Sequence, residues 1–104
     1  PTPAADIAAT LLALAQALRD GAPGGLYHYG GQPETSWAGF ARAIFAKAGR
    51  AVTVTGIATA DWPTPAPRPL NSRLDCAKLA TDFGITAPDW QAGLGRVIRE
   101  LGHG

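Results

Sequence analysis

The chain has 104 residues, of which 46% are hydrophobic and 16% are charged. This composition predicts a globular protein, because disordered chains are less apolar and more strongly charged, and the length suits one small domain. Nine basic and eight acidic side chains are scattered singly and give a net charge of +1, so no basic stripe indicates nucleic-acid binding. The longest apolar stretch, residues 7–18, is too short to span a membrane as a helix.

The single cysteine, Cys76, cannot form an intrachain disulfide, which favours a reducing, cytoplasmic setting. The chain begins at Pro1, contains no methionine and shows no signal-peptide pattern. We therefore expect residues 1–104 to be one domain-sized piece of a longer protein.

The first element predicted is a helix that starts at Thr2, as the capping residue, and Pro3. Apolar residues then recur at helical spacing up to Leu18, and Gly21 supplies the stop. Residues 26–29 are rich in aromatics and bounded by glycines, which predicts a short strand.

A second helix is predicted to open at Thr35 or Ser36, to carry a continuous apolar face and to end at Gly49. The β-branched residues 52–55 predict a second strand. Prolines at positions 63, 65, 67 and 69 predict an extended loop over residues 61–70, since each removes an amide donor and disfavours helix in the residue before it.

After the loop, residues 71–74 are assigned to a third short strand. Asp75 is expected to cap a small helix that stops at Gly84, and a last amphipathic helix begins near Asp89. The expected fold class is therefore α/β, with about four helices and two or three short strands.

No glycine-rich dinucleotide loop, phosphate-binding lysine loop or nucleophile elbow is found in the sequence, so no catalytic or cofactor-binding residue is predicted. His28 and His103 have no carboxylate or cysteine at ligand spacing, and no metal site is predicted. His28 is interpreted as a strand residue with a satisfied hydrogen bond. Cys76 is interpreted as a small packing residue at a helix start.

Trp37 and Trp90 lie on apolar helical stripes and are predicted to be core anchors, whereas Trp62 lies in the proline loop and is predicted to face solvent or a ligand. The prolines restrict the unfolded chain, so Arg68, Asn71 and Ser72 can be held around a ligand at a low entropic cost. Arg68 has the planar fork that suits phosphate or carboxylate. The alternative is that the loop only wraps a core and Arg68 pairs with a surface acid.

Four blocks of sequence resemble the dTDP-4-dehydrorhamnose reductase family. They are Gly25-Leu26-Tyr27-His28 with Gly30; Glu34-Thr35-Ser36-Trp37 with Phe40-Ala41-Arg42; Pro63-Thr64-Pro65-Ala66 with Arg68-Pro69, Asn71-Ser72, Leu74-Asp75 and Lys78-Leu79; and Pro88-Asp89-Trp90 with Gly93-Leu94. Order and spacing match throughout, over nearly the whole chain and about the last third of a family member. Trp62 replaces the usual tyrosine, and Leu70 the frequent alanine.

The resemblance implies the C-terminal, substrate-binding portion of an extended short-chain dehydrogenase/reductase. Such an enzyme reduces dTDP-4-dehydro-β-L-rhamnose to dTDP-β-L-rhamnose with NADPH or NADH, in dTDP-rhamnose biosynthesis. Its Rossmann cofactor domain and Tyr-x-x-x-Lys pair lie earlier in the chain. Tyr27 and Tyr29 here are followed four places later by glycine and proline, so this piece is expected to contribute neither catalytic residues nor a cofactor site.

The expected partners are the dTDP-sugar and the N-terminal Rossmann domain, and the substrate-binding residues are Arg68, Asn71, Ser72 and Trp62. Some family members form homodimers with a metal held near the chain end, so the resemblance allows a homodimer, but Glu100 alone is too little to predict a metal site. The resemblance also implies that residues 26–29 form an edge strand, and we expect an isolated fragment to self-associate there.

Two alternatives stay open at this stage. The chain could belong to a relative that has lost catalysis and acts as a regulatory subunit. It could instead be a helical interaction module that uses the Trp37 and Trp90 faces to bind a partner; burial of both tryptophans would exclude that reading.

Overall fold

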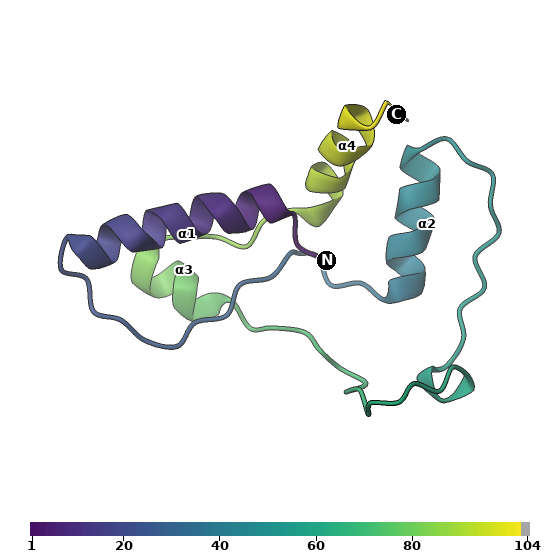
Figure 1. Ribbon diagram of the computed structural model, residues 1–104, viewed down its shortest axis with the longest axis horizontal. Helices are drawn as coiled ribbons and strands as arrows, with labels where there is room; N and C mark the ends of the chain where they lie inside the picture. Colours follow the sequence, from purple (N-terminus) through teal and green to yellow (C-terminus); the bar gives the residue numbers. More distant parts are fainter. Residues whose placement is uncertain (103–104) are drawn as a thin grey trace.

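The structure is a computed structural model that describes residues 1–102. Four α-helices and one short 3₁₀ helix form in this range (Figure 1). In chain order they are α1 (Ala4–Arg19), α2 (Trp37–Lys47), η1 (Thr59–Asp61), α3 (Ala77–Phe83) and α4 (Trp90–Glu100). The predicted number of helices and their places in the sequence are therefore confirmed.

The ends of the helices agree with the local signals in the sequence. Ser36 caps α2, and its Oγ accepts a hydrogen bond from the Gly39 amide at 3.0 Å. Asp89 caps α4 in the same way, through a 2.9 Å bond from the Gln91 amide. Gly49 and Gly84 follow α2 and α3 with φ angles of 68° and 67°, a conformation that glycine adopts without strain.

Two predicted caps differ in detail. The capping residue of α1 is Pro3, which makes no side-chain cap. Thr2 instead accepts a 2.9 Å hydrogen bond at Oγ1 from the amide of Gly31, far along the chain. Asp75 lies one residue before the cap position of α3, although its Oδ1 still accepts a 3.0 Å bond from the Ala77 amide.

The prediction of an α/β fold is wrong for the part of the chain that the structure describes. Residues 26–29, 52–55 and 71–74 were expected to be strands, but no strand forms within residues 1–102. An isolated parallel bridge joins Gln32 to Asp89. The physical reason is that a strand is defined by a paired neighbour, and apolar, β-branched composition cannot supply one.

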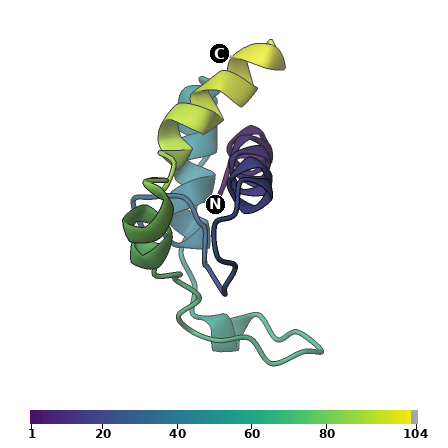
Figure 2. The ribbon, with the colours of Figure 1, turned by 90° about the vertical axis from the view of Figure 1, so that its left-hand side faces the viewer.

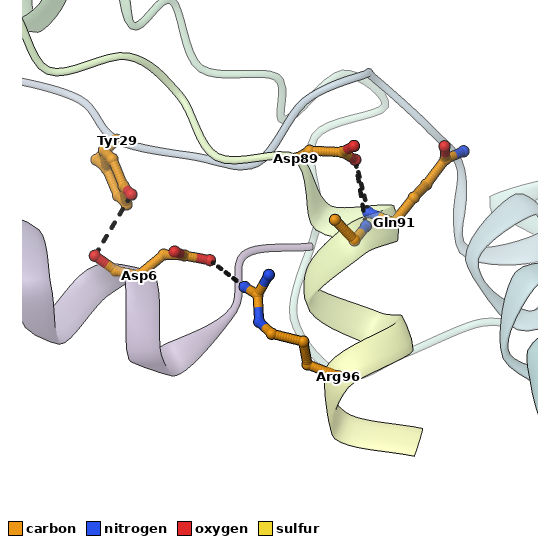
Figure 3. A network of polar contacts seen from close by, with 6 residues as sticks. Asp6, Tyr29, Asp89, Gln91 and Arg96 are labelled. Atoms are coloured by element: carbon orange, nitrogen blue, oxygen red, sulfur yellow. Dashed lines mark hydrogen bonds and ion pairs between the residues drawn. The ribbon is translucent and has the colours of Figure 1, made fainter. Parts of the chain in front are cut away.

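Residues 26–29 show what replaces the missing sheet. Tyr27 stacks edge-on against Phe83 of α3, with ring centroids 5.2 Å apart. Tyr29 turns the other way, and its hydroxyl donates to the Asp6 carbonyl of α1 at 3.4 Å (Figure 3). Side-chain contacts to two different helices, α3 and α1, thus hold this segment in place without a paired strand.

Helix α4 contacts both α2 and α1. Helix α2 packs beside α4, and both stand upright in Figure 1. The Phe40 ring of α2 meets Trp90 edge-on at 5.6 Å between centroids, and the Trp90 indole donates a 2.6 Å hydrogen bond to the Pro33 carbonyl. Arg96 of α4 pairs with Asp6 of α1 at 3.4 Å (Figure 3).

The core is small for a chain of this length. The buried apolar side chains among the described residues are Leu79, Trp90 and Ile98. The radius of gyration is 16.7 Å, whereas a compact domain of about 100 residues has about 13 Å. Trp37 is 87% exposed, so its prediction as a core anchor is wrong, while that for Trp90 is confirmed.

Large apolar side chains are correspondingly common on the surface. They are Ile7, Leu11, Leu12, Leu18, Leu26, Trp37, Val52, Ile57, Trp62, Leu70, Leu74, Val97 and Leu101. Such an extent of exposed apolar surface is characteristic of a body that packs against another one.

Candidate functional site

The proline-rich loop projects away from the four helices. After η1 it runs along the lower edge of the molecule and returns to α3 (Figures 1 and 2). Residues 62–73 form no helix or strand and all are exposed. The prediction of an extended loop over residues 61–70 is therefore confirmed except at Asp61, which ends η1.

Two adjoining hollows lie where the end of this loop meets residues 30–35. The first has a volume of about 160 Å³, and Ser72, Arg73 and Leu74 from the loop side face Gly30, Gly31 and the residues after them across it. The second, of about 420 Å³, extends toward Asp75 and Cys76. Four residues line both hollows: Gln32, Glu34, Arg73 and Leu74.

A polar network stands in the wall that the hollows share. Arg73 Nη1 donates to Glu34 Oε2 at 2.6 Å, an ion pair that bridges two segments far apart in sequence. Arg73 also donates twice to Asn71 Oδ1, from Nε at 2.9 Å and from its own amide at 3.0 Å. Glu34, Arg73 and Asn71 thus form one connected unit.

The structure separates the four predicted site residues. Ser72 lines the first hollow. Asn71 lines neither hollow, but its Oδ1 accepts hydrogen bonds from Arg73, which lines both. Trp62 and Arg68 come earlier in the loop and also line neither hollow. Trp62 is 72% exposed, as expected for a surface or ligand-facing aromatic. Arg68 is exposed and forms no ion pair with another residue of 1–102, so pairing with a surface acid is not observed.

Glu34 and Arg73 were missed as site residues. Glu34 opens one of the sequence blocks that carry the family resemblance, and Arg73 lies between Ser72 and Leu74 of another. The two side chains have opposite charges and lie in two separate blocks, and this is the signal from which an ion pair could have been predicted. Only the fold shows that these two residues, 39 positions apart in the sequence, lie within hydrogen-bonding distance.

Helix α3 holds residues 26–29 beside the hollows through a second cluster. Tyr27 donates a 2.7 Å hydrogen bond to Asp82 Oδ2. Lys78 Nζ donates to the Leu26 carbonyl at 3.0 Å and lies 4.5 Å from the centre of the Tyr27 ring, a cation–π contact. These contacts fix the register of the segment that leads into Gly30.

The hydrogen bond to Asp82 raises the pKa of Tyr27 above the ordinary 10.0, with smaller contributions from burial and from the charge of the carboxylate. Because the folded-state pKa is the higher one, the stabilisation is complete below pH 10 and is lost as the pH rises through the folded pKa. We expect Asp82→Asn to return the pKa of Tyr27 toward its ordinary value. NMR titration of ring-labelled tyrosine, assigned with Tyr27→Phe, would measure it; an unchanged pKa would contradict the assignment.

The remaining candidate residues have simple environments. Cys76 is half-buried at the start of α3, and its thiol lies 3.8 Å from the Gly30 carbonyl oxygen, which fits the expected packing role. His28 is exposed, and His103 lies outside the described residues. Within residues 1–102, no three or more histidine, cysteine or acidic residues are grouped so that they could hold a metal ion. None of the helices described is both long and apolar enough to cross a membrane.

Comparison with known proteins supplies the context for this geometry. A family model described as the RmlD substrate binding domain matches residues 1–103. The dTDP-4-dehydrorhamnose reductase of Sinorhizobium fredii is 38% identical, over 97% of this chain and 36% of that protein. That of Burkholderia thailandensis is 42% identical over 97% of this chain and 38% of that protein, and that of Aggregatibacter actinomycetemcomitans is 42% identical over 90% and 35%.

The chain thus spans about a third of the length of the curated relatives it matches. The relatives carry the name that the four sequence blocks indicated, and the family resemblance is confirmed. The described hollows and the proline loop are parts of a domain that belongs to the RmlD substrate-binding domain family.

Proposed function

We propose that this chain binds the sugar nucleotide in a dTDP-4-dehydrorhamnose reductase, which reduces dTDP-4-dehydro-β-L-rhamnose to dTDP-β-L-rhamnose. The observation that carries the proposal is the match of residues 1–103 to a substrate-binding family, together with reductase relatives along 90–97% of the chain. The hollows between the proline loop and residues 30–35 support it, because they offer hydrogen-bonding groups at a concave surface.

In this proposal each loop residue contacts a different part of the sugar nucleotide. Arg68 has a free guanidinium on an exposed, proline-stiffened segment, which suits the diphosphate. Asn71 and Ser72 lie at or beside the first hollow and can hydrogen-bond to sugar or base oxygens. Trp62 presents an exposed indole on which a ring can stack.

The nicotinamide cofactor of such a reductase, NADPH or NADH, does not fit the residues described here. A dinucleotide site needs a glycine-rich turn between a strand and a helix. Within residues 1–102 no strand is present, and the glycines with positive φ lie after helices. Residues 1–102 would therefore bind and orient the sugar nucleotide, and the cofactor would be held elsewhere in the enzyme.

A cofactor-binding Rossmann domain is the partner that we propose for the exposed apolar surface. Leu11 and Leu12 on α1 are 60% and 71% exposed, although α1 is the longest helix. Covering them would contribute about 25 cal/mol for each square ångström of apolar surface removed from water. A cytoplasmic location and a homodimer of the complete enzyme belong to the same proposal.

The complete protein that carries this chain tests the proposal directly. We expect oxidation of NADPH or NADH, followed by absorbance, that depends on dTDP-4-dehydro-β-L-rhamnose. Arg68→Ala should raise KM for the sugar nucleotide about 10- to 100-fold, the usual effect of losing a charge-assisted hydrogen bond. Arg50→Ala is the matched control, since Arg50 is an exposed arginine outside the loop.

Two results would count against the proposal. Absence of turnover with either cofactor would favour the regulatory-subunit alternative. Equal KM values for Arg68→Ala and the wild type would remove Arg68 from the site. For the interaction-module alternative the two tryptophans give different results: Trp90 is 3% exposed and cannot present a binding face, whereas Trp37 is 87% exposed, so the condition of two buried tryptophans is not met.

A further inference from the structure

The network at the end of the proline loop has a definite chemical polarity. A guanidinium carries only hydrogen-bond donors, whereas a carboxamide has one acceptor oxygen and one NH₂ donor group. Both hydrogen bonds from Arg73 end on Asn71, so the atom that Asn71 turns toward Arg73 must be its oxygen. The position of the NH₂ group follows, because it is bonded to the same carbon and points the other way.

Glu34 fixes the orientation of the Arg73 guanidinium that donates to Asn71. Its carboxylate holds Arg73 Nη1 at 2.6 Å, so the guanidinium is anchored at one end by Glu34 and bonded through Nε to Asn71. Lysine cannot reproduce this, since its single ammonium has no second, geometrically fixed donor on the side chain. The arrangement therefore depends on arginine and not only on positive charge.

The Asn71 NH₂ group is left free to act. It donates to no acceptor within residues 1–102, and Asn71 is exposed. The next two residues, Ser72 and Arg73, line the first hollow. Asn71 itself lines neither hollow but directly precedes Ser72, which lines the first. The hydrogen bonds that Asn71 Oδ1 accepts from Arg73 restrict the side chain, and so reduce the entropy lost when its NH₂ group binds a ligand.

We propose that Glu34 and Arg73 are positioning residues that hold Asn71 as an obligate hydrogen-bond donor to an oxygen of the sugar nucleotide. This inference rests on the proposed function, because it needs the ligand to be present. It assigns to the ligand an acceptor at this point, which a phosphate, sugar or pyrimidine carbonyl oxygen can provide. Glu34 and Arg73 act through Asn71 and not by touching the ligand.

Stability alone does not account for the network. The Arg73 and Glu34 side chains are 59% and 53% exposed, and ion pairs with that exposure contribute little to folding. Substitutions in the network are therefore expected to change ligand binding and to leave the melting temperature nearly unchanged.

Asn71→Asp is the discriminating variant in the complete protein. Aspartate keeps an oxygen for both Arg73 donors and keeps the local turn, but it replaces the NH₂ donor with a charged acceptor. We expect KM for dTDP-4-dehydro-β-L-rhamnose to rise at least about tenfold, with the melting temperature maintained. A purely structural Asn71 would tolerate this change, so an unchanged KM would overturn the inference.

Arg73→Lys and Glu34→Gln test the positioning residues. Both should raise KM by a smaller factor, about three- to tenfold, and leave kcat close to the wild-type value. If Arg73 contacted the ligand directly, Glu34→Gln would release its charge and lower KM, which would contradict a positioning role. Arg96→Lys is the control, because it alters the exposed Arg96–Asp6 pair between α4 and α1 and should leave KM unchanged.

Measurements on the wild-type protein distinguish failure of the proposed function from failure of the role given to Asn71. Turnover by the wild type with no response to Asn71→Asp would reject the inference and retain the proposed function. No turnover and no binding of dTDP by calorimetry would reject both.

Discussion

Replacing Trp90 by alanine should lower the free energy of unfolding by about 3–5 kcal/mol, the usual loss for a large aromatic removed from a core. Trp90 is 3% exposed and is one of three buried apolar side chains among residues 1–102. It meets Phe40 edge-on and donates to the Pro33 carbonyl, so it joins α4 both to α2 and to the segment before it. Urea unfolding of the complete protein, followed by circular dichroism, would measure the loss.

Two variants place that loss in context. Trp90→Phe keeps most of the ring and loses the indole donor, so a smaller loss of about 1–3 kcal/mol is expected. Trp62→Ala is the matched control, because the Trp62 side chain is 72% exposed and its removal should change stability by less than about 0.5 kcal/mol. Equal effects of Trp90→Ala and Trp62→Ala would contradict the packing described.

Two glycines of α4 are expected to respond to alanine with opposite signs. At Gly93 an added Cβ would overlap the ring of Pro3, which caps α1 and cannot rotate away. Gly93→Ala should therefore destabilise the protein by about 1–3 kcal/mol. At Gly95 an added Cβ meets only the flexible end of Arg99, at 3.5 Å, so Gly95→Ala should stabilise the helix by about 0.5–1 kcal/mol.

The paired glycines make the measurement independent of helix propensity. Both lie inside the same helix two residues apart, so the propensity gain is nearly the same and the difference reports the contact with Pro3. Thermal or urea midpoints of the two variants would be compared with the wild type. A shift of the same sign for both would show that α4 does not approach the start of α1 as described.

The candidate site was predictable in part. Asn71 and Ser72 could be chosen because short polar residues follow a proline-stiffened loop, and the structure places Ser72 in a hollow wall. Arg68 and Trp62 were predicted as site residues from the same loop, but they line neither hollow. Glu34 and Arg73 were missed because charge pairs across the fold have no signature in local sequence; both residues look like ordinary surface charges until the backbone brings them together.

The apolar patterns were less reliable guides to burial than to helix formation. Trp37 and Trp90 both lie on apolar helical stripes, yet one is 87% exposed and the other 3%. A stripe shows which face of a helix avoids water and does not show what covers that face. For Trp37 no described residue covers the ring fully, although Phe40 lies 6.4 Å away between centroids.

The sequence by itself determined where α2 and α4 begin and where α2 and α3 end, because those limits depend on short-range chemistry: Ser36 and Asp89 accept hydrogen bonds from amides two or three residues ahead, and Gly49 and Gly84 adopt positive φ. It also determined the extended proline loop. The tertiary structure alone decided that the expected strands do not form a sheet, and that Glu34, Arg73 and Asn71 meet. Both outcomes depend on partners distant along the chain, and local propensity carries no information about which partners are present.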